Sequence, residues 1–199
     1  MKLFYTPGAC SLSPHIALKE AGVAHQIEKV DLRARKTASG GDFLAINPKG
    51  YVPALQLDDG SVLTEGPAIV QYIADQKPES GLAPKAGTKE RYQLQEWLTF
   101  VSSELHKQCS PLFNPSLSDD TKKFFRDKIS GRLKWLDGEL AKSQYLMGDR
   151  FTVADGYLYT ILTWSPRLGI EVTQWPNVKA FFDRVAARPK VREAQQAEA

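Results

Sequence analysis

The pattern of this sequence changes near residue 80, and that change constrains the fold more than any other feature. Before it, short segments with strand-like alternation are interleaved with helical segments; after it, every periodic segment has helical spacing. A stretch rich in Pro, Gly and Ser spans residues 77–87, which is typical of a linker between domains. We therefore predict two domains, 1–78 and 89–199, joined by a linker at 79–88.

The first domain is predicted to be an α/β domain with the element order βαβαββα. Strands are expected at 2–5 and 26–32, helices at 14–20, 42–46 and 67–76, and a hairpin around Asp59 and Gly60. Ser13 is the candidate N-cap of the first helix, and Gly22 follows its last turn as a C-cap does.

The second domain is predicted to be all-α. Apolar residues recur at helical spacing from Leu94 to Leu105, and further helices are expected at 124–142 and 176–188. The run Thr152 to Asp155 has the form of a capping box and opens a mostly apolar helix, which we place at the centre of this domain. The polar tail that follows is expected to be irregular.

Composition excludes several classes of protein. Hydrophobic residues make up 42% of the 199 residues, and the net charge of +3 comes from well-mixed charges, so neither a nucleic acid nor a membrane is an expected partner. The first apolar run ends at Thr6, too early for a signal peptide, and we expect a cytoplasmic protein. Cys10 and Cys109 with three scattered histidines have no metal-ligand spacing, so no metal site is predicted.

Cys10 lies in the turn between the first strand and the first helix, within YTPGACSLSPHIALKE. Unpaired N–H groups and the helix dipole at such a terminus favour the thiolate, and the small neighbours Gly8 and Ser11 leave room for a ligand. The motif CSLS lacks a second cysteine, so a mixed disulfide with an external thiol is favoured over an internal disulfide. The plainer alternative is a small buried side chain, which is our expectation for Cys109.

Two other motifs each resemble half of a binding site. In GYVPAL, Val52 precedes Pro53 at a strand start, where the peptide bond is either an ordinary trans bond or a cis bond that exposes the Val52 backbone to a ligand. In TEGPAI, Gly66 as N-cap would leave N–H groups for a carboxylate, and Glu65 would bind an ammonium. Acid stabilisation of a first helical turn is the alternative for Glu65.

Together these motifs resemble a family. YTPGACSLSPHIAL, INPKGYVPAL and LTEGPAIVQYIAD, followed by a helical half that carries FTVADGYL, are similar to cytosolic glutathione S-transferases, most closely to the bacterial beta class. The resemblance covers essentially the whole chain. It implies a thioredoxin-like first domain, an α-helical second domain, and glutathione as co-substrate with no further cofactor.

The resemblance also assigns roles to residues of the first domain. Pro53 would be the family's cis-proline, Val52 would pair with the cysteinyl backbone of glutathione, and Glu65 with Gly66 would hold its γ-glutamyl end. Cys10, flanked by Ser11, would contact the glutathione sulfur, either through a hydrogen bond or as a mixed disulfide. Arg35 stands where the class usually has Lys, and would reach the glycyl carboxylate.

The long helix supplies the remaining candidates. Thr99, Ser103 and His106 are spaced i, i+4 and i+7, which predicts one shared face opposite the apolar stripe. The resemblance implies that this face looks toward glutathione, with His106 near the sulfur and Glu104 reaching the site of a partner subunit. Thr99 replaces the Asn usual in the class. A solvated histidine on a polar face is the alternative for His106.

The predicted function is conjugation of the glutathione thiolate to a small hydrophobic electrophile by a homodimer, with Cys10, Ser11 and His106 as catalytic candidates. The alternatives are thiol transfer or dehalogenation through a mixed disulfide on Cys10, and a non-catalytic carrier of glutathione or hydrophobic ligands. Five residues are candidates for lining an apolar cleft: Phe113, Tyr157, Tyr159, Trp164 and Pro166.

Overall fold

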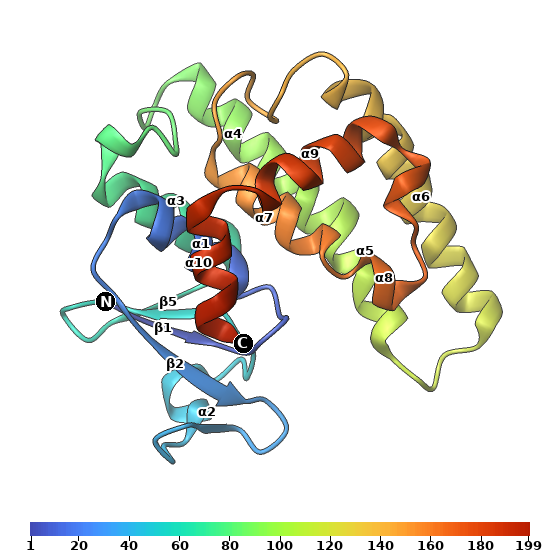
Figure 1. Ribbon diagram of the computed structural model, residues 1–199. Helices are drawn as coiled ribbons and strands as arrows, with labels where there is room; N and C mark the ends of the chain where they lie inside the picture. Colours follow the sequence, from blue (N-terminus) through green and yellow to red (C-terminus); the bar gives the residue numbers. More distant parts are fainter. The chain divides into compact units, whose positions relative to one another are not determined.

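The computed structural model describes residues 1–199, the whole of the printed sequence. The chain forms two compact units: the first unit is Met1–Ala83 together with Arg188–Ala199, and the second unit is Pro84–Ala187. The last residues of the predicted 89–199 domain, from Arg188 onward, lie in the first of these units (Figure 1).

The first unit is built on a five-stranded sheet with the strand order β3-β2-β1-β4-β5. Its strands are β1 (Lys2–Tyr5), β2 (Gln26–Asp31), β3 (Lys36–Thr37), β4 (Ala54–Gln56) and β5 (Val62–Thr64). β1 pairs with β2 in parallel, and the other pairs are antiparallel. The predicted element order lacked β3, because a strand of two residues has no alternation to detect.

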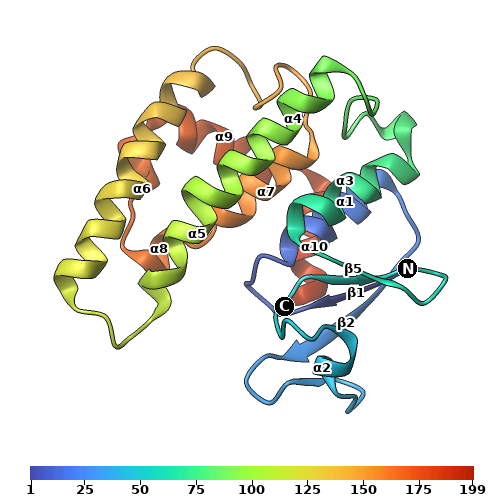
Figure 2. The same cartoon turned by 180° about the vertical axis from the view of Figure 1, so that it is seen from behind.

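Helices cover both faces of this sheet. They are α1 (Leu12–Ala21), α2 (Phe43–Ile46), α3 (Gly66–Gln76) and α10 (Pro189–Glu198), with a 3-10 turn at Pro78–Ser80. α1, α3 and α10 lie together on one face, and α2 lies on the other (Figures 1 and 2). This is the thioredoxin-like α/β arrangement that the sequence predicted.

The central strand β1 is buried on both sides. Leu3 faces the layer of α1 and α3 and is fully buried, while Phe4 packs against Phe43 of α2 with ring centroids 6.0 Å apart. Val52 and Ala54 belong to the same apolar cluster as Phe4. Each such side chain contributes about 1.5–3 kcal/mol when fully buried, so this cluster fixes the segment around Val52 against the sheet.

The C-terminal helix α10 is attached to α1 at both ends. Arg188 forms a two-pronged ion pair with Glu20, at 2.6 and 2.8 Å, and Glu198 accepts from or donates to His15 Nδ1 at 2.9 Å. Val191 and Ala194 between them are fully buried. The expectation of an irregular tail was wrong, because a few well-placed apolar residues suffice to dock an otherwise polar helix.

The second unit is a helical bundle. Its elements are α4 (Lys89–Phe100), a π-helical segment (Val101–His106), α5 (Lys107–Cys109), a 3-10 segment (Ser110–Phe113), α6 (Asp119–Leu140), α7 (Val153–Leu162), α8 (Ser165–Leu168), a 3-10 turn (Val172–Gln174) and α9 (Pro176–Ala186). Every residue of α7 is buried, which confirms its predicted central position. No helix of the chain has both the length and the hydropathy that crossing a bilayer requires.

The start of α7 is held by the predicted capping box. The Asp155 carboxylate accepts hydrogen bonds from Thr152 N and Thr152 Oγ1 and from Leu146 N, each at 2.8 Å. Asp155 is fully buried, and burial raises the pKa of its carboxyl to about 6. This carboxylate joins the loop before α7 to the helix itself.

Candidate functional site

The turn that carries Cys10 is closed by its neighbour Ser11. Ser11 is fully buried, and its hydroxyl accepts from Thr6 N at 3.2 Å and donates to Thr6 O at 3.3 Å. Gly8 has a φ of 71°, a left-handed conformation that glycine adopts without strain. The geometry thus gives Ser11 a structural place in the turn, which differs from its predicted catalytic role.

Helix α1 begins earlier than predicted. Its first residue is Leu12 and Ser11 occupies the N-cap position, so the predicted cap Ser13 lies inside the helix. Ser13 is buried, and its hydroxyl has no hydrogen-bond partner. The predicted C-cap is confirmed, because Gly22 has a φ of 66°.

The sulfur of Cys10 lies beside the loop that precedes β4. Cys10 Sγ donates to the carbonyl oxygen of Val52 at 3.4 Å. The peptide bond between Val52 and Pro53 is cis. The motif of Cys10 and the motif of Val52, forty-two positions apart in the chain, are therefore adjacent in space. Because the sulfur is the donor, this hydrogen bond requires the protonated thiol.

The loop before Val52 is ordered by side chains. Asn47 Nδ2 donates to Tyr51 O at 2.7 Å, and the guanidinium of Arg35 donates to the carbonyl of Gly50. Gly50 has a φ of 72°, a left-handed conformation that other residues adopt only with strain. Arg35 thus lies against the segment that leads to the cis bond.

Glu65 lies at the start of α3 and already binds a cation. Its Oε1 accepts from Lys49 Nζ at 2.6 Å and from the Tyr51 hydroxyl at 2.7 Å. These hydrogen bonds to Glu65 raise the pKa of Lys49 and the pKa of Tyr51. The sequence predicted an ammonium partner for Glu65 but missed Lys49 and Tyr51, although both flank Gly50 in the NPKGYVPAL motif.

The N-cap of α3 lies one residue earlier than predicted. Glu65 occupies the N-cap position and Gly66 is the first helical residue. Because Pro67 has no N–H, the N–H of Gly66 is the donor that this terminus offers to a ligand. The N–H of Gly66 thus lies beside the Glu65 carboxylate, and only the N-cap position differs from the prediction, by one residue.

Two residues outside glycine have positive φ values, and both were candidates from the sequence. Arg35 has a φ of 57° and Glu65 a φ of 70°. Such conformations cost about 1–3 kcal/mol each and cluster at functional sites. The strain indicates that the fold holds these two side chains in place for a reason other than stability.

The candidates on the long helix differ in what their side chains contact. The hydroxyls of Thr99 and Ser103 are exposed and donate to backbone carbonyls one turn earlier, at 2.7 and 3.0 Å. The π-helical segment Val101–His106 changes the angular spacing between Ser103 and His106. His106 is half-buried whereas Thr99 and Ser103 are exposed, so the three side chains lie in different surroundings, and a common face for them stays a prediction.

His106 is packed among aromatic rings of the second unit. Its Nδ1 lies 2.6 Å from the hydroxyl oxygen of Tyr157, and its ring lies 5.1 Å from that of Trp164. Burial, with a smaller effect of Lys107, lowers the pKa of His106 to about 4. The imidazole is thus neutral at neutral pH, and the alternative of a solvated histidine does not hold.

The other second-unit candidates divide into exposed and core residues. Glu104 Oε2 is bound by Arg132 of the same chain, through Nε at 2.8 Å and Nη2 at 2.6 Å. Tyr157, Tyr159 and Trp164 are at most 5% exposed, whereas Phe113 is 45% exposed and Pro166 is also exposed. Arg167 lies over the Phe113 ring at 5.5 Å. Of the predicted cleft residues, Phe113 and Pro166 reach the surface.

Cys109 has the environment of a structural residue. It is 3% exposed, and burial raises the pKa of its thiol to about 12. No group of three or more His, Cys, Asp or Glu is arranged to bind a metal ion.

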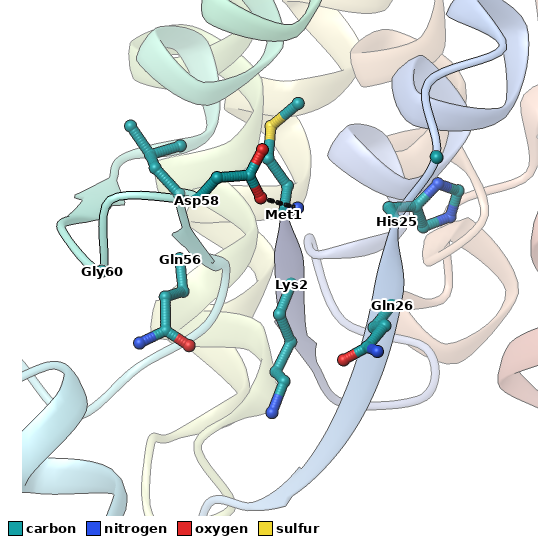
Figure 3. Close-up of a pocket in the computed structure, with 9 residues that line it drawn as sticks. Met1, Lys2, His25, Gln26, Gln56, Asp58 and Gly60 are labelled. Carbon is teal, nitrogen blue, oxygen red and sulfur yellow. Dashed lines mark hydrogen bonds and ion pairs between the residues drawn. The ribbon is translucent and has the colours of Figure 1, made fainter.

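A cavity of about 590 Å³ lies at the other end of β1 from Cys10. Figure 3 shows its lining: Met1, Lys2, Ala24, His25, Gln26, Gln56, Leu57, Asp58 and Gly60. The amino terminus is paired there with Asp58 at 2.6 Å. None of the predicted site residues lies in this cavity, so the candidate site is defined by the contacts of Cys10, Val52 and Glu65 instead.

The chain matches two family models. Residues 8–76 match the glutathione S-transferase N-terminal domain, and residues 100–189 match the glutathione S-transferase C-terminal domain. The chain is 42% identical to glutathione S-transferase GstA of Escherichia coli O157:H7 over 198 residues, which cover all of this chain and 98% of GstA.

Solved structures agree with this match. A ternary complex of BphK, a bacterial glutathione S-transferase, superposes with a TM-score of 0.98 at 56% identity and covers 100% and 99% of the two chains. A sphingomonad glutathione S-transferase complexed with glutathione has a TM-score of 0.97 at 50% identity, with coverage of 100% and 98%. A beta-class enzyme of Sphingomonas chungbukensis is equally similar, at 0.97 and 50%.

Proposed function

This chain belongs to the glutathione S-transferase family and is a glutathione transferase, and we propose that it joins the glutathione thiolate to small hydrophobic electrophiles beside Cys10. The observation that carries the proposal is the contact between Cys10 Sγ and Val52 O, next to the cis bond to Pro53. This contact places the Cys10 thiol beside the segment around Val52, whose backbone can pair with an extended peptide.

The polar groups around this contact suit the three parts of glutathione. The Val52 backbone would pair with the cysteinyl residue, and the Gly66 N–H with Glu65 would hold the γ-glutamyl carboxylate and ammonium. Lys49 Nζ lies 2.6 Å from Glu65 Oε1, and the ammonium of glutathione would displace it from this carboxylate. Arg35 would bind the glycyl carboxylate, since its guanidinium already lies on this loop.

The chemistry needs an anionic sulfur at a defined place. The glutathione thiol gives its proton to solvent, the thiolate attacks the electrophilic carbon, a sulfur–carbon bond forms, and the leaving group departs with its electron pair. Positioning and stabilisation of negative charge at sulfur supply the rate enhancement.

The second candidate is thiol transfer through Cys10, favoured by the presence of a thiol where conjugation needs none. The Cys10 thiolate would attack the glutathione sulfur of a disulfide between glutathione and another thiol, form a Cys10–glutathione mixed disulfide and release the other thiolate; a second glutathione thiolate would then attack this disulfide, restore the free Cys10 and leave as glutathione disulfide. In dehalogenation, a glutathione thiolate would first displace the halide from carbon; the Cys10 thiolate would then attack the sulfur of that thioether and form the same mixed disulfide, while the carbon leaves with the electron pair and takes up a proton. The two candidates share the site and differ in whether Cys10 reacts.

The test compares Cys10→Ala with the wild type and with the matched variant Cys109→Ala. We expect Cys10→Ala to lose thiol transfer and to keep conjugation of a model aryl halide. Intact-mass measurement after exposure to glutathione disulfide should show one glutathione on the wild type and on Cys109→Ala, and none on Cys10→Ala. If Cys10→Ala transferred thiols at the wild-type rate, Cys10 would take no part in the reaction.

We also propose a homodimer formed through an aromatic patch of the second unit. Trp97, Phe100 and Trp135 contact one another with centroids 4.9–5.9 Å apart, and Trp135 is 48% exposed. Exposed aromatic clusters of this kind mark protein interfaces. Light scattering should give twice the chain mass, and Trp135→Glu should shift the protein toward monomer; a wild-type monomer at micromolar concentration would contradict the proposal.

A further inference from the structure

We propose that Lys49 is a specificity-determining residue: its ammonium occupies the place on Glu65 that the ammonium of glutathione must take, so the ligand binds by exchange with a side chain of the protein. This inference deepens the proposed function and rests on it, because it requires that Glu65 holds the γ-glutamyl end. It assigns a task to a lysine that was not among the candidates from the sequence.

The Lys49 ammonium lies among oxygen atoms at the start of α3. Its Nζ is 2.6 Å from Glu65 Oε1 and 3.0 Å from Thr64 Oγ1, and both distances are within hydrogen-bond range. The Tyr51 hydroxyl donates to the same Glu65 oxygen at 2.7 Å and can keep this bond whichever ammonium is present. These oxygens therefore form a site for an ammonium group, which the chain fills with its own lysine.

Only the side chain of Lys49 has to move for the exchange. Its backbone is fixed by Asn47, whose side-chain oxygen accepts from Lys49 N at 3.2 Å and whose Nδ2 donates to Tyr51 O at 2.7 Å. The Lys49 side chain is 47% exposed, and a lysine carries a strongly hydrated charge on a flexible stem. It can therefore leave Glu65 for solvent by rotation about side-chain bonds, while the segment that leads to Val52 stays in place.

The exchange lowers the gain in affinity that a ligand obtains from its ammonium. Glutathione replaces one ion pair on Glu65 by another, so only the difference between the two pairs contributes to binding. A ligand without the ammonium leaves Lys49 in place and meets no competition there. Because specificity is a difference of affinities, Lys49 sets how strongly the site distinguishes γ-glutamyl peptides with an α-ammonium from those that lack it.

Both competing groups are charged at neutral pH. The hydrogen bond from Lys49 to Glu65 raises the pKa of Lys49 above its ordinary value, so Lys49 stays protonated wherever the α-ammonium of a peptide is protonated. A change of pH in the neutral range therefore does not free Glu65. The place is vacated only when a ligand ammonium enters it or when the lysine is replaced.

The first experiment measures dissociation constants by calorimetry for reduced glutathione and for glutaryl-cysteinylglycine, which is glutathione without its α-amino group. Lys49→Met should bind glutathione about threefold more tightly than the wild type, the usual size of an exposed ion pair, and should not bind the glutaryl peptide more tightly. Lys77→Met is the matched control, because Lys77 in the same unit has a similar exposure in its pair with Glu79, and it should change neither constant.

The same measurements in Glu65→Gln connect the effect to the carboxylate. Adding Lys49→Met to Glu65→Gln should leave the dissociation constant for glutathione unchanged, because the lysine then has no ion pair to give up. A gain as large as in the wild-type background would show that Lys49 acts without Glu65, and the proposal would be wrong.

Two other results of the first experiment would overturn the proposal. Unchanged or weaker binding of glutathione by Lys49→Met would show that Lys49 does not compete with the ligand, and an equal gain for both peptides would show that the ammonium is not the competing group. If the wild type binds no glutathione, the proposed function itself fails. If the wild type binds glutathione but Lys49→Met has no effect, only this inference fails.

The second experiment follows the displacement directly by 15N NMR of the lysine ammonium groups, with the Lys49 signal identified by its loss in Lys49→Met. Saturating glutathione should move this signal to the position of a solvated lysine, and saturating glutaryl-cysteinylglycine should leave it unmoved. In Glu65→Gln the signal should lie at the solvated position without any ligand. A signal that stays in place at saturating glutathione would mean that Lys49 remains on Glu65, which contradicts the exchange.

Discussion

The first and second units hold their candidate residues by different means. Around Cys10, the side chains are exposed or partly buried and are placed by strained backbone at Arg35 and Glu65 and by short loops. Around His106, placement comes from burial among the aromatic rings of Tyr157 and Trp164. Changes in the second unit should therefore act mainly on stability, and changes in the first unit mainly on ligand binding.

The largest expected effect is the loss of the buried carboxylate of the second unit. Asp155→Ala removes three hydrogen bonds at 2.8 Å and leaves the Leu146 N–H buried without a partner. We expect the free energy of unfolding to fall by about 3 kcal/mol, measured by urea denaturation. Asp149→Ala, at an exposed position nearby, is the control. If Asp149→Ala lowered the free energy of unfolding by a similar amount, the effect of Asp155→Ala could not be assigned to the capping box.

The next effect concerns pH and His106. The folded pKa of His106 is about 4, below the value near 6.5 of an unfolded histidine. The unfolded state therefore binds the proton first, and stability is lost as pH falls from about 6.5 to 4, by about 3 kcal/mol, since one pKa unit corresponds to about 1.4 kcal/mol. The difference between wild type and His106→Gln in unfolding free energy should show this slope. A pH-independent difference would mean that the imidazole is solvated.

A smaller effect is expected from the turn of the first unit. Ser11→Ala removes the hydroxyl that bonds both backbone groups of Thr6 and should cost about 1–2 kcal/mol of stability. Because the same turn places Cys10, glutathione affinity should fall as well. Ser116→Ala, at an exposed position of the second unit, should change neither quantity. Unaltered affinity in Ser11→Ala would show that Cys10 is placed without Ser11.

The smallest effect on stability should come from the residue with the clearest binding role. Glu65 is 54% exposed in its ion pair with Lys49, so Glu65→Gln should change the unfolding free energy by less than about 0.5 kcal/mol. The dissociation constant for glutathione, measured by calorimetry, should rise about tenfold, which equals about 1.4 kcal/mol. Glu79→Gln is the exposed control. If Glu65→Gln lost stability but kept its affinity for glutathione, the proposed difference between the two units would be wrong.

Local chemistry explains what could be predicted. The hairpin turn at Asp59 and Gly60, the left-handed Gly22 and the capping box at Thr152 depend on residues a few positions apart, and the structure contains all three. The strands and helices around them were found within a few residues. Two-residue β3 and the polar helix α10 were missed, because their pairing partners lie elsewhere in the chain.

The candidate site was only partly predictable for the same reason. Cys10, Val52 and Glu65 could be singled out from their motifs, but the partners Lys49, Tyr51 and Tyr157 could not, since each depends on a distance in space. The expected common face of Thr99, Ser103 and His106 assumed an unbroken α-helix, whereas the segment Val101–His106 is π-helical.

The amino-acid sequence by itself determined the order of most elements, several of their turns and caps, and the family, because these depend on neighbouring residues and on motifs in a fixed order. Only the tertiary structure decided that α10 joins the first unit, that Ser11 closes a turn and that His106 faces Tyr157. These features depend on burial and hydrogen bonds between residues that are distant in the sequence, and such interactions contribute free energy only once the chain has folded.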